Sequence, residues 1–256
     1  MFIPLHDQNS LKHIRLQYVT LLIIAANVVI FLFTGTPALV AVDQANSIHL
    51  SFGFIPAVVN DYAVLPPSHA LLPEQASYVT YAFFHAGFMH LVGNMLFLWV
   101  FGDNVEDAMG HFRFLLFYIA CAIAGAWTHS FTFPESQAPL IGASGAAAGV
   151  IGAYLVLHPK VKIWVLAFGR IPLRLSALWV LTAWIGFQVF SYLAPGDTAV
   201  SFAAHIGGFF IGAILVIFMR KRGVPLWDRN LATQPSPAEP VAADDLSPHS
   251  WGRPEN

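Results

Sequence analysis

Six long apolar stretches alternate with shorter polar segments along this chain of 256 residues. Each stretch is long enough to form a helix of about 20 residues, the length that crosses a bilayer core of about 30 Å. The stretches are continuously apolar, whereas the strands of a membrane β-barrel alternate between apolar and polar positions. The pattern therefore predicts an all-α, polytopic membrane protein with six transmembrane helices. The predicted spans cover residues 16–35, 83–102, 112–131, 140–157, 173–194 and 201–219.

The basic residues indicate how these spans are oriented. A path that crosses the membrane six times places all twelve Lys and Arg residues on one side. Cytoplasmic segments of membrane proteins are enriched in Lys and Arg, so both termini are expected in the cytoplasm. The basic residues are Lys12, Arg15, Arg113, Lys160, Lys162, Arg170, Arg174, Arg220, Lys221, Arg222, Arg229 and Arg253.

The same arrangement predicts the domain organisation. The first loop on the outer side, at about residues 36–82, carries Phe52, Phe54 and Ile55 among prolines and glycines. Such a loop is too apolar for a solvated linker, so we expect it to associate with the outer leaflet of the membrane. The C-terminal region is rich in Pro, Ala, Ser, Asp and Glu and is expected to be disordered. The predicted segments are a cytoplasmic N-terminal segment (1–15), a six-helix membrane domain (16–220) and a cytoplasmic tail (221–256).

Composition narrows the possible functions. Hydrophobic residues make up 57% of the chain and charged residues only 10%, which is far from the roughly 45–50% and about 25% of soluble domains. The formal net charge of −2 gives no general attraction for nucleic acid, so no nucleic-acid partner is expected. The single cysteine, Cys121, excludes an intramolecular disulfide and a cysteine metal cluster. Because an HExxH motif is also missing from the sequence, we expect neither a metal nor another cofactor.

Four polar side chains inside the predicted spans are candidate functional residues, because polar groups in a membrane-embedded helix are costly. They are His90 and Asn94 in the second span, Ser144 in the fourth and His205 in the sixth. These spans all run from outside to inside, and each residue lies within about the first dozen positions, which is about 5–20 Å below the outer end. His90 and Asn94 are four residues apart and therefore share one helix face.

The surroundings of Ser144 and His205 suit nucleophilic catalysis. Ser144 begins its span, where unpaired backbone N–H groups and the positive end of the helix dipole favour a developing oxyanion. A neutral imidazole can remove the proton of the hydroxyl, which is otherwise a weak nucleophile. No Asp or Glu of the spans is placed to orient this histidine, so we predict a Ser-His dyad. Small residues allow close helix packing, and the predicted packing glycines are Gly142, Gly145, Gly149, Gly208 and Gly212.

Three motifs in these spans resemble those of rhomboid intramembrane serine proteases, and they read HAGFMHLVGN (85–94), GASG (142–145) and AHIGGFFIG (204–212). The resemblance covers about residues 75–220. It implies a six-helix rhomboid-like bundle in which Ser144 is the nucleophile and His205 is the general base and then the general acid. It also implies an oxyanion hole formed by Asn94, His90 and the backbone N–H of Ser144.

The resemblance further implies the substrates and the location. The substrates are expected to be membrane proteins that are cut within or beside a transmembrane helix. The expected location is the bacterial inner (plasma) membrane, with the lipid bilayer as the surrounding solvent. A catalytically inactive rhomboid-like protein that binds membrane-protein clients stays open as the alternative, although such relatives typically lack the serine or the histidine.

The chain departs from the family pattern at two places. A Trp-Arg pair often found in the first loop is replaced by Ser77 and Tyr78. The aromatic residue that often follows the nucleophile by four positions and stacks under the histidine is Ala148, which leaves that space for another aromatic residue. Trp184 is expected to contact lipid or the membrane interface, as Trp residues of membrane proteins commonly do.

Three further polar residues are expected to have structural roles. His85 lies near the outer end of the second span and is expected to tie the first loop to the helix. Glu106 and Asp107 lie on the cytoplasmic side, opposite the candidate site, and are expected to cap the next helix or to bind backbone donors.

Overall fold

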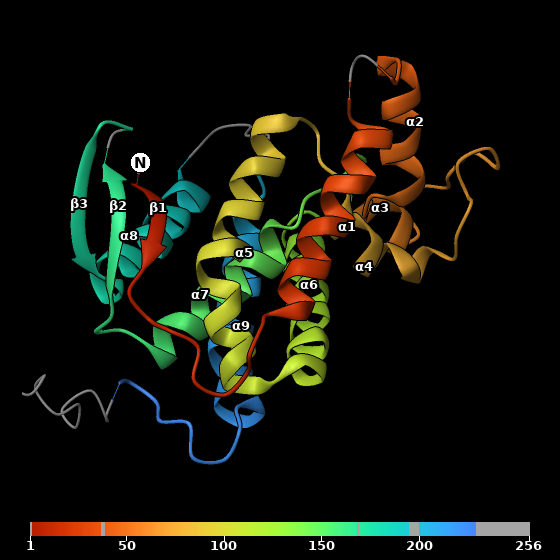
Figure 1. The fold of residues 1–256 in the computed structure, drawn as a ribbon. Coiled ribbons are helices and arrows are strands. Elements are labelled where there is room, and N and C mark those ends of the chain that lie inside the picture. The colour runs from red at the N-terminus through yellow and green to blue at the C-terminus, as the bar shows by residue number, and fades with distance from the viewer. Residues whose placement is uncertain (1, 37–38, 168, 195–199, 229–256) are drawn as a thin grey trace, which may run out of the picture.

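The computed structural model describes residues 2–36, 39–167, 169–194 and 200–228 and is mostly helical (Figure 1). The predicted disordered tail lies outside the described residues from position 229 onward. The α-helices are Tyr18–Thr34 (α1), Val42–Phe52 (α2), Pro56–Val59 (α3), Ser77–Thr80 (α4), Phe88–Met109 (α5), His111–Thr132 (α6), Ser144–Leu157 (α7), Ala177–Leu193 (α8) and Phe202–Met219 (α9). Two 3-10 helices, Glu74–Ala76 (η1) and Tyr81–Phe83 (η2), flank α4.

The six predicted spans correspond to α1 and α5 to α9, although several ends differ by a few residues. α6 and α9 are each long and apolar enough to cross a membrane. A third candidate combines Glu74–Phe83 with α5, and these two parts are bent by 85°. α1, α7 and α8 are apolar but shorter, with 17, 14 and 17 residues. The described residues thus contain two or three candidate spans by length and composition, and the count of six stays a prediction.

α7 begins four residues later than the predicted span, because residues 140–143 are held in a non-helical conformation. Leu140 exchanges two backbone hydrogen bonds with Phe54, which lies between α2 and α3, with N–O distances of 3.0 and 2.8 Å. Gly142 has a φ of +122°, which side-chain-bearing residues rarely adopt. Its N–H donates to the carbonyl oxygen of Tyr81 at 3.0 Å. The segment between α1 and α5 therefore holds the residues that lead into α7 and places Ser144 at the first position of the helix.

The prediction of an all-α protein was wrong for three segments, which form an antiparallel sheet in the order β1-β2-β3. In β2, the alternating residues Ile163, Val165 and Ala167 are buried, a pattern typical of a strand with one covered face. This sheet pairs the N-terminal segment with the connection between α7 and α8. Because the pairing joins distant parts of the chain, none of these segments shows its strand partner when each is considered alone. The strands are Phe2–Asp7 (β1), Lys162–Ala167 (β2) and Ile171–Ser176 (β3).

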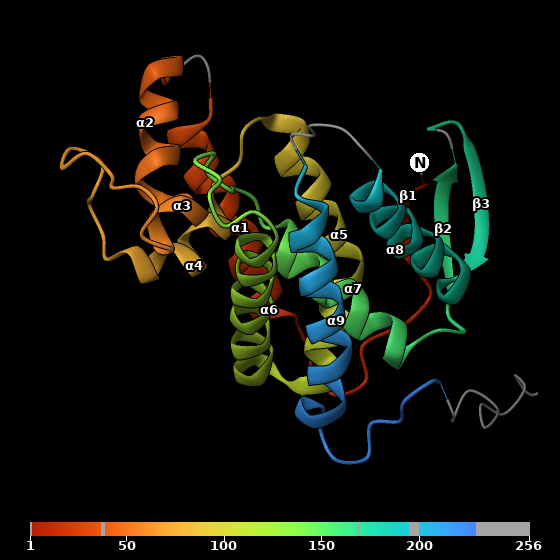
Figure 2. The ribbon, with the colours of Figure 1, turned by 180° about the vertical axis from the view of Figure 1, so that it is seen from behind.

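α7 occupies the centre of the helical bundle. It packs against α5, α6 and α9, and every residue from Gly145 to Tyr154 is buried, as expected for a helix that is apolar on all sides. In both ribbon views the sheet and α8 lie on one side of this bundle, and α2 lies on the opposite side (Figure 1, Figure 2).

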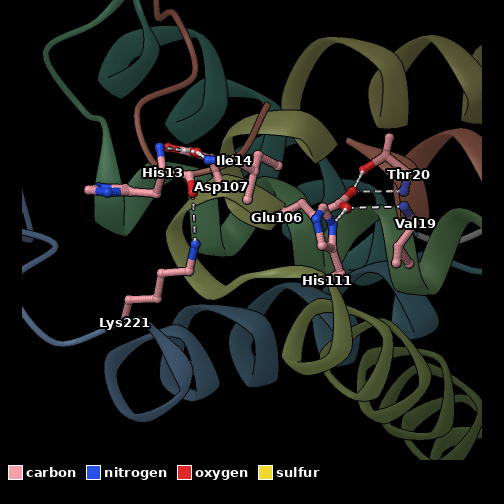
Figure 3. Close-up of polar contacts among 8 residues, drawn as sticks. All are labelled: His13, Ile14, Val19, Thr20, Glu106, Asp107, His111 and Lys221. Atoms are coloured by element: carbon pink, nitrogen blue, oxygen red, sulfur yellow. Dashed lines mark hydrogen bonds and ion pairs between the residues drawn. The ribbon is translucent and has the colours of Figure 1, made fainter. Parts of the chain in front are cut away.

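The C-terminal end of α5 is joined to the N-terminal segment and to the start of α1 by two buried carboxylates (Figure 3). Asp107 accepts hydrogen bonds from three consecutive backbone N–H groups, those of residues 12–14, at 2.6 to 3.0 Å. Glu106 accepts from the backbone N–H groups of Val19 and Thr20 at 3.0 and 2.8 Å. These two N–H groups lie in the first turn of α1, where they have no partner within the helix. Both carboxylates therefore bind backbone donors, as predicted. Glu106 caps the start of α1, whereas the donors of Asp107 precede that helix.

Candidate active site

α7 and α9 pack backbone against backbone through glycines. A Cβ added to Gly208 would lie 1.9 Å from the carbonyl oxygen of Gly145, and one added to Gly212 would lie 2.1 Å from that of Gly149. Side-chain carbon atoms do not fit at such distances, so glycine is required at these crossing points. The contact runs in parallel from the N-terminal parts of both helices, which carry the candidate nucleophile on α7 and the candidate base, His205, on α9.

Ser144 lies at the N-terminal end of the mostly buried helix α7. It is the first residue of the helix, and its side chain is half-buried. Backbone N–H groups in the first turn of a helix have no intrahelical partner and can bind an oxyanion. Within the described residues, the hydroxyl of Ser144 makes no hydrogen bond, and His205 is not its partner in this state.

His205 lies one turn into α9 and is 9% exposed. Its Nδ1 is 2.8 Å from Oε1 of Gln188 on α8. The ring of Trp184, also on α8, stacks on the imidazole with a centroid distance of 6.0 Å and an interplanar angle of 29°. The ring of Phe202, in the preceding turn of α9, is nearly perpendicular to the imidazole, with a centroid distance of 6.3 Å. The Gln188 contact occupies Nδ1 and leaves Nε2 as the nitrogen that can act on a hydroxyl.

His90 and Asn94 lie beside the loop that precedes Ser144. A Cβ built on Gly142 would be 2.6 Å from Nε2 of His90 and 3.6 Å from Nδ2 of Asn94. Gly142 thus precedes α7 and leaves space for His90, in contrast to the glycines that pack α7 on α9. The structure brings these three residues together at the N-terminal end of α7.

His85 connects the Asn94 side chain to this loop. Its Nε2 is 2.9 Å from Nδ2 of Asn94 and accepts the backbone N–H of Ala143 at 3.4 Å. A backbone N–H is always a donor, so Nε2 of His85 is the unprotonated nitrogen of this ring. The Asn94 amide has two N–H donors, and His85 takes one of them. The second N–H can be offered to a substrate oxygen.

The helical fold, with its apolar candidate membrane spans, is that of a membrane-embedded protein. A comparison of the sequence with known families then identifies the family. Residues 73–222, more than half of the chain, match the family described as Rhomboid domain. The chain therefore belongs to the rhomboid family of membrane-embedded proteins.

Individual relatives are similar over the same region. Rhomboid protein 1, mitochondrial, of Saccharomyces cerevisiae is 32% identical over 157 residues, which cover 58% of this chain and 43% of the relative. Rhomboid-related protein 2 of Mus musculus is 32% identical over 159 residues, or 59% of this chain and 52% of the relative. Rhomboid protease GluP of Bacillus subtilis is 36% identical over 133 residues, or 51% of this chain and 24% of the relative. The chain thus spans about half or less of the length of these relatives.

The sequence analysis missed two residues of the site, and both come from α8. Gln188 was not singled out, although a polar amide in an apolar helix is itself a signal because its burial is costly. Trp184 was expected to contact lipid or the interface, but its ring stacks on His205. Trp184 thus places an aromatic ring against the imidazole from α8, in a chain that has Ala148 four positions after Ser144.

Proposed function

We propose that this chain is an intramembrane serine protease that hydrolyses peptide bonds within or next to transmembrane segments of membrane-protein substrates. The observation that carries the proposal is the glycine contact between α7 and α9, which joins the ends of the helices that carry Ser144 and His205. A hydroxyl and an imidazole with a free Nε2 are the minimum for nucleophilic acyl transfer. GluP, which is similar over about half of this chain, is named as a rhomboid protease.

The proposed reaction proceeds through an acyl-enzyme. Ser144 Oγ attacks the scissile carbonyl carbon while its proton moves to Nε2 of His205, which later returns the proton to the leaving amine. The carbonyl oxygen becomes an oxyanion that accepts hydrogen bonds from the backbone N–H of Ser144 and from the side chains of Asn94 and His90. Water then attacks the acyl carbon while the same imidazole takes its proton. The ester bond breaks as Ser144 Oγ leaves and takes that proton back, which releases the carboxylic acid product. None of these steps needs a metal or a cofactor.

The proposed setting is a six-helix bundle in the bacterial inner membrane with both termini in the cytoplasm. The positions of all twelve basic residues support this orientation. Asp107 at the C-terminal end of α5 supports it as well, because it holds the basic N-terminal segment at that end. A helical substrate hides its carbonyl groups in hydrogen bonds. We therefore expect cleavage near Gly, Ala, Ser or Pro residues; among these, Gly and Pro favour an unwound backbone.

A serine-directed fluorophosphonate probe tests the nucleophile directly. The full chain in liposomes should be labelled at Ser144, and labelling should be lost in Ser144→Ala and reduced in His205→Ala. Ser10→Ala, which changes an exposed serine outside the site, is the matched control and should be labelled like the wild type. A metal chelator should leave the labelling unchanged.

The labelling result, together with a test for client binding and fragment release, distinguishes the alternative function. An unlabelled wild-type protein that retains a membrane-protein client equally well with and without Ser144, and never releases a fragment, would be an inactive client-binding relative. That result would contradict the proposed protease.

A further inference from the structure

α8 supplies the two side chains that hold the His205 ring. Trp184 and Gln188 are four residues apart and therefore share one face of the helix. The Gln188 amide oxygen meets the ring edge at Nδ1, 2.8 Å away. Trp184 covers a ring face at a centroid distance of 6.0 Å. Contacts at the edge and at the face together fix both the position and the rotation of the imidazole.

The burial of Gln188 indicates that this contact is built into the fold. Gln188 is 5% exposed and is the one buried residue in the second half of α8. The other buried residues of this helix, Ala177, Val180 and Leu181, lie in its first half. A buried amide without a partner costs about 1–3 kcal/mol. Within the described residues, the hydrogen bond to His205 is the one side-chain hydrogen bond that either group makes.

The contact also determines which nitrogen of His205 carries the proton. The amide oxygen of Gln188 only accepts hydrogen bonds, so Nδ1 must be the donor and Nε2 keeps its lone pair. That tautomer is the one a general base needs for the serine hydroxyl. A carboxylate would give the same tautomer but would have to be buried as a charge in an apolar bundle, which is costly. Glutamine orients the ring without that charge.

We propose that Gln188 is a positioning residue for His205, so that the site is a Ser144–His205–Gln188 array with a neutral third member. This inference rests on the proposed protease function and specifies how its base is oriented. Gln188 acts only through the imidazole and contacts no substrate atom. Trp184, on the same helix as Gln188, stacks on the His205 ring. An aromatic contact is thus made from α8, whereas α7 has Ala148 at the position where the family often has an aromatic residue.

Two substitutions in the reconstituted full chain test the proposal. Gln188→Met keeps most of the side-chain volume but removes the hydrogen bond, so kcat for cleavage of a single-span substrate should fall by about tenfold or more with KM little changed. Gln188→Glu restores an acceptor and adds a charge that favours the protonated ring. The acidic limb of the kcat/KM profile should then move to higher pH by about 1 pH unit. His90, which also acts electrostatically on His205, is retained in both variants.

Thr182→Val is the matched control, because it removes an exposed polar group from the same helix, and it should behave like the wild type. All rates are divided by the fraction of protein that elutes as folded, monodisperse protein in size-exclusion chromatography. Fluorophosphonate labelling is not used for this purpose, because it depends on His205 and would hide a loss of base function. A purely structural role predicts lower melting temperatures with an unmoved pH profile in Gln188→Glu, and this result would overturn the proposal. Wild-type kcat in Gln188→Met would overturn it as well.

The failure of the underlying function gives a different result. If the wild type neither cleaves nor is labelled, the protease itself is refuted. If the wild type cleaves in a Ser144-dependent manner and the Gln188 variants match it, only the positioning role is refuted.

Discussion

Gly208→Ala tests whether the close contact between α7 and α9 is needed for activity. The added methyl carbon would lie 1.9 Å from the carbonyl oxygen of Gly145, whereas ordinary contact begins at 3.4 Å. The two backbones must therefore separate locally by about 1.5 Å. Because Gly145 follows Ser144 directly and Gly208 follows His205 by three residues, this separation acts at the site itself. A misplacement of about 1 Å can cost about 100-fold in rate.

We therefore expect kcat/KM for a single-span substrate to fall by about 100-fold in Gly208→Ala. Overpacking of this kind also destabilises by about 1–3 kcal/mol, so the melting temperature in detergent should decrease. Gly186→Ala on α8 is the matched control, since a Cβ there meets no atom within 4 Å, and it should keep both values. Wild-type activity of Gly208→Ala, measured on a folded sample, would refute the reasoning that glycine packing aligns the two side chains.

Three further predictions concern other parts of the molecule. Asn94→Ala should lower kcat by about 10²–10³-fold in the same cleavage assay, as expected for the loss of one oxyanion donor, with labelling of Ser144 retained. Glu106→Gln leaves a single acceptor oxygen for the donors at the start of α1. It should lower the free energy of unfolding by about 1–3 kcal/mol, whereas Glu135→Gln, at an exposed position, should not. Burial raises the pKa of Asp7 above its ordinary value of 3.8. The folded state therefore holds this proton more tightly than the unfolded state, and the resulting stability is present below pH 3.8 and is lost as the pH rises through the raised pKa. Thermal unfolding as a function of pH should thus show a flatter profile for Asp7→Asn than for the wild type, and parallel profiles would count against the burial effect.

The sequence predicts the helices of this fold well where apolar residues are continuous. The span predicted at 112–131 is the helix His111–Thr132, because nothing in that segment competes with helix formation. The prediction was less successful where long-range contacts decide the structure. Residues 140–143 are apolar enough for a helix, but hydrogen bonds to Phe54 and Tyr81 hold them in a different conformation. The sheet was missed for the same reason, since β1 and β2 are separated by more than 150 residues of sequence.

The candidate site shows a similar division. Ser144, His205, His90 and Asn94 can be selected from the sequence because each is a polar residue at a similar depth in an apolar span. Gln188 is likewise a polar residue in an apolar span, which is a signal in the sequence, but no motif accompanies it. Its role depends on how α8 is placed against α9, which packing decides and local sequence does not. The same holds for the aromatic ring that stacks on His205. It belongs to Trp184 of α8 and not to the helix of the nucleophile, and only the three-dimensional arrangement shows this contact.

The most direct test of the central claim is the cleavage of a tagged single-span membrane protein by the reconstituted chain, beside its Ser144→Ala variant. We predict a new N-terminus within or next to the transmembrane segment of the substrate, identified by sequencing the fragment, in the wild-type reaction only. Equal amounts of the same fragment from both proteins, or no fragment from any substrate in a broad panel, would contradict the account.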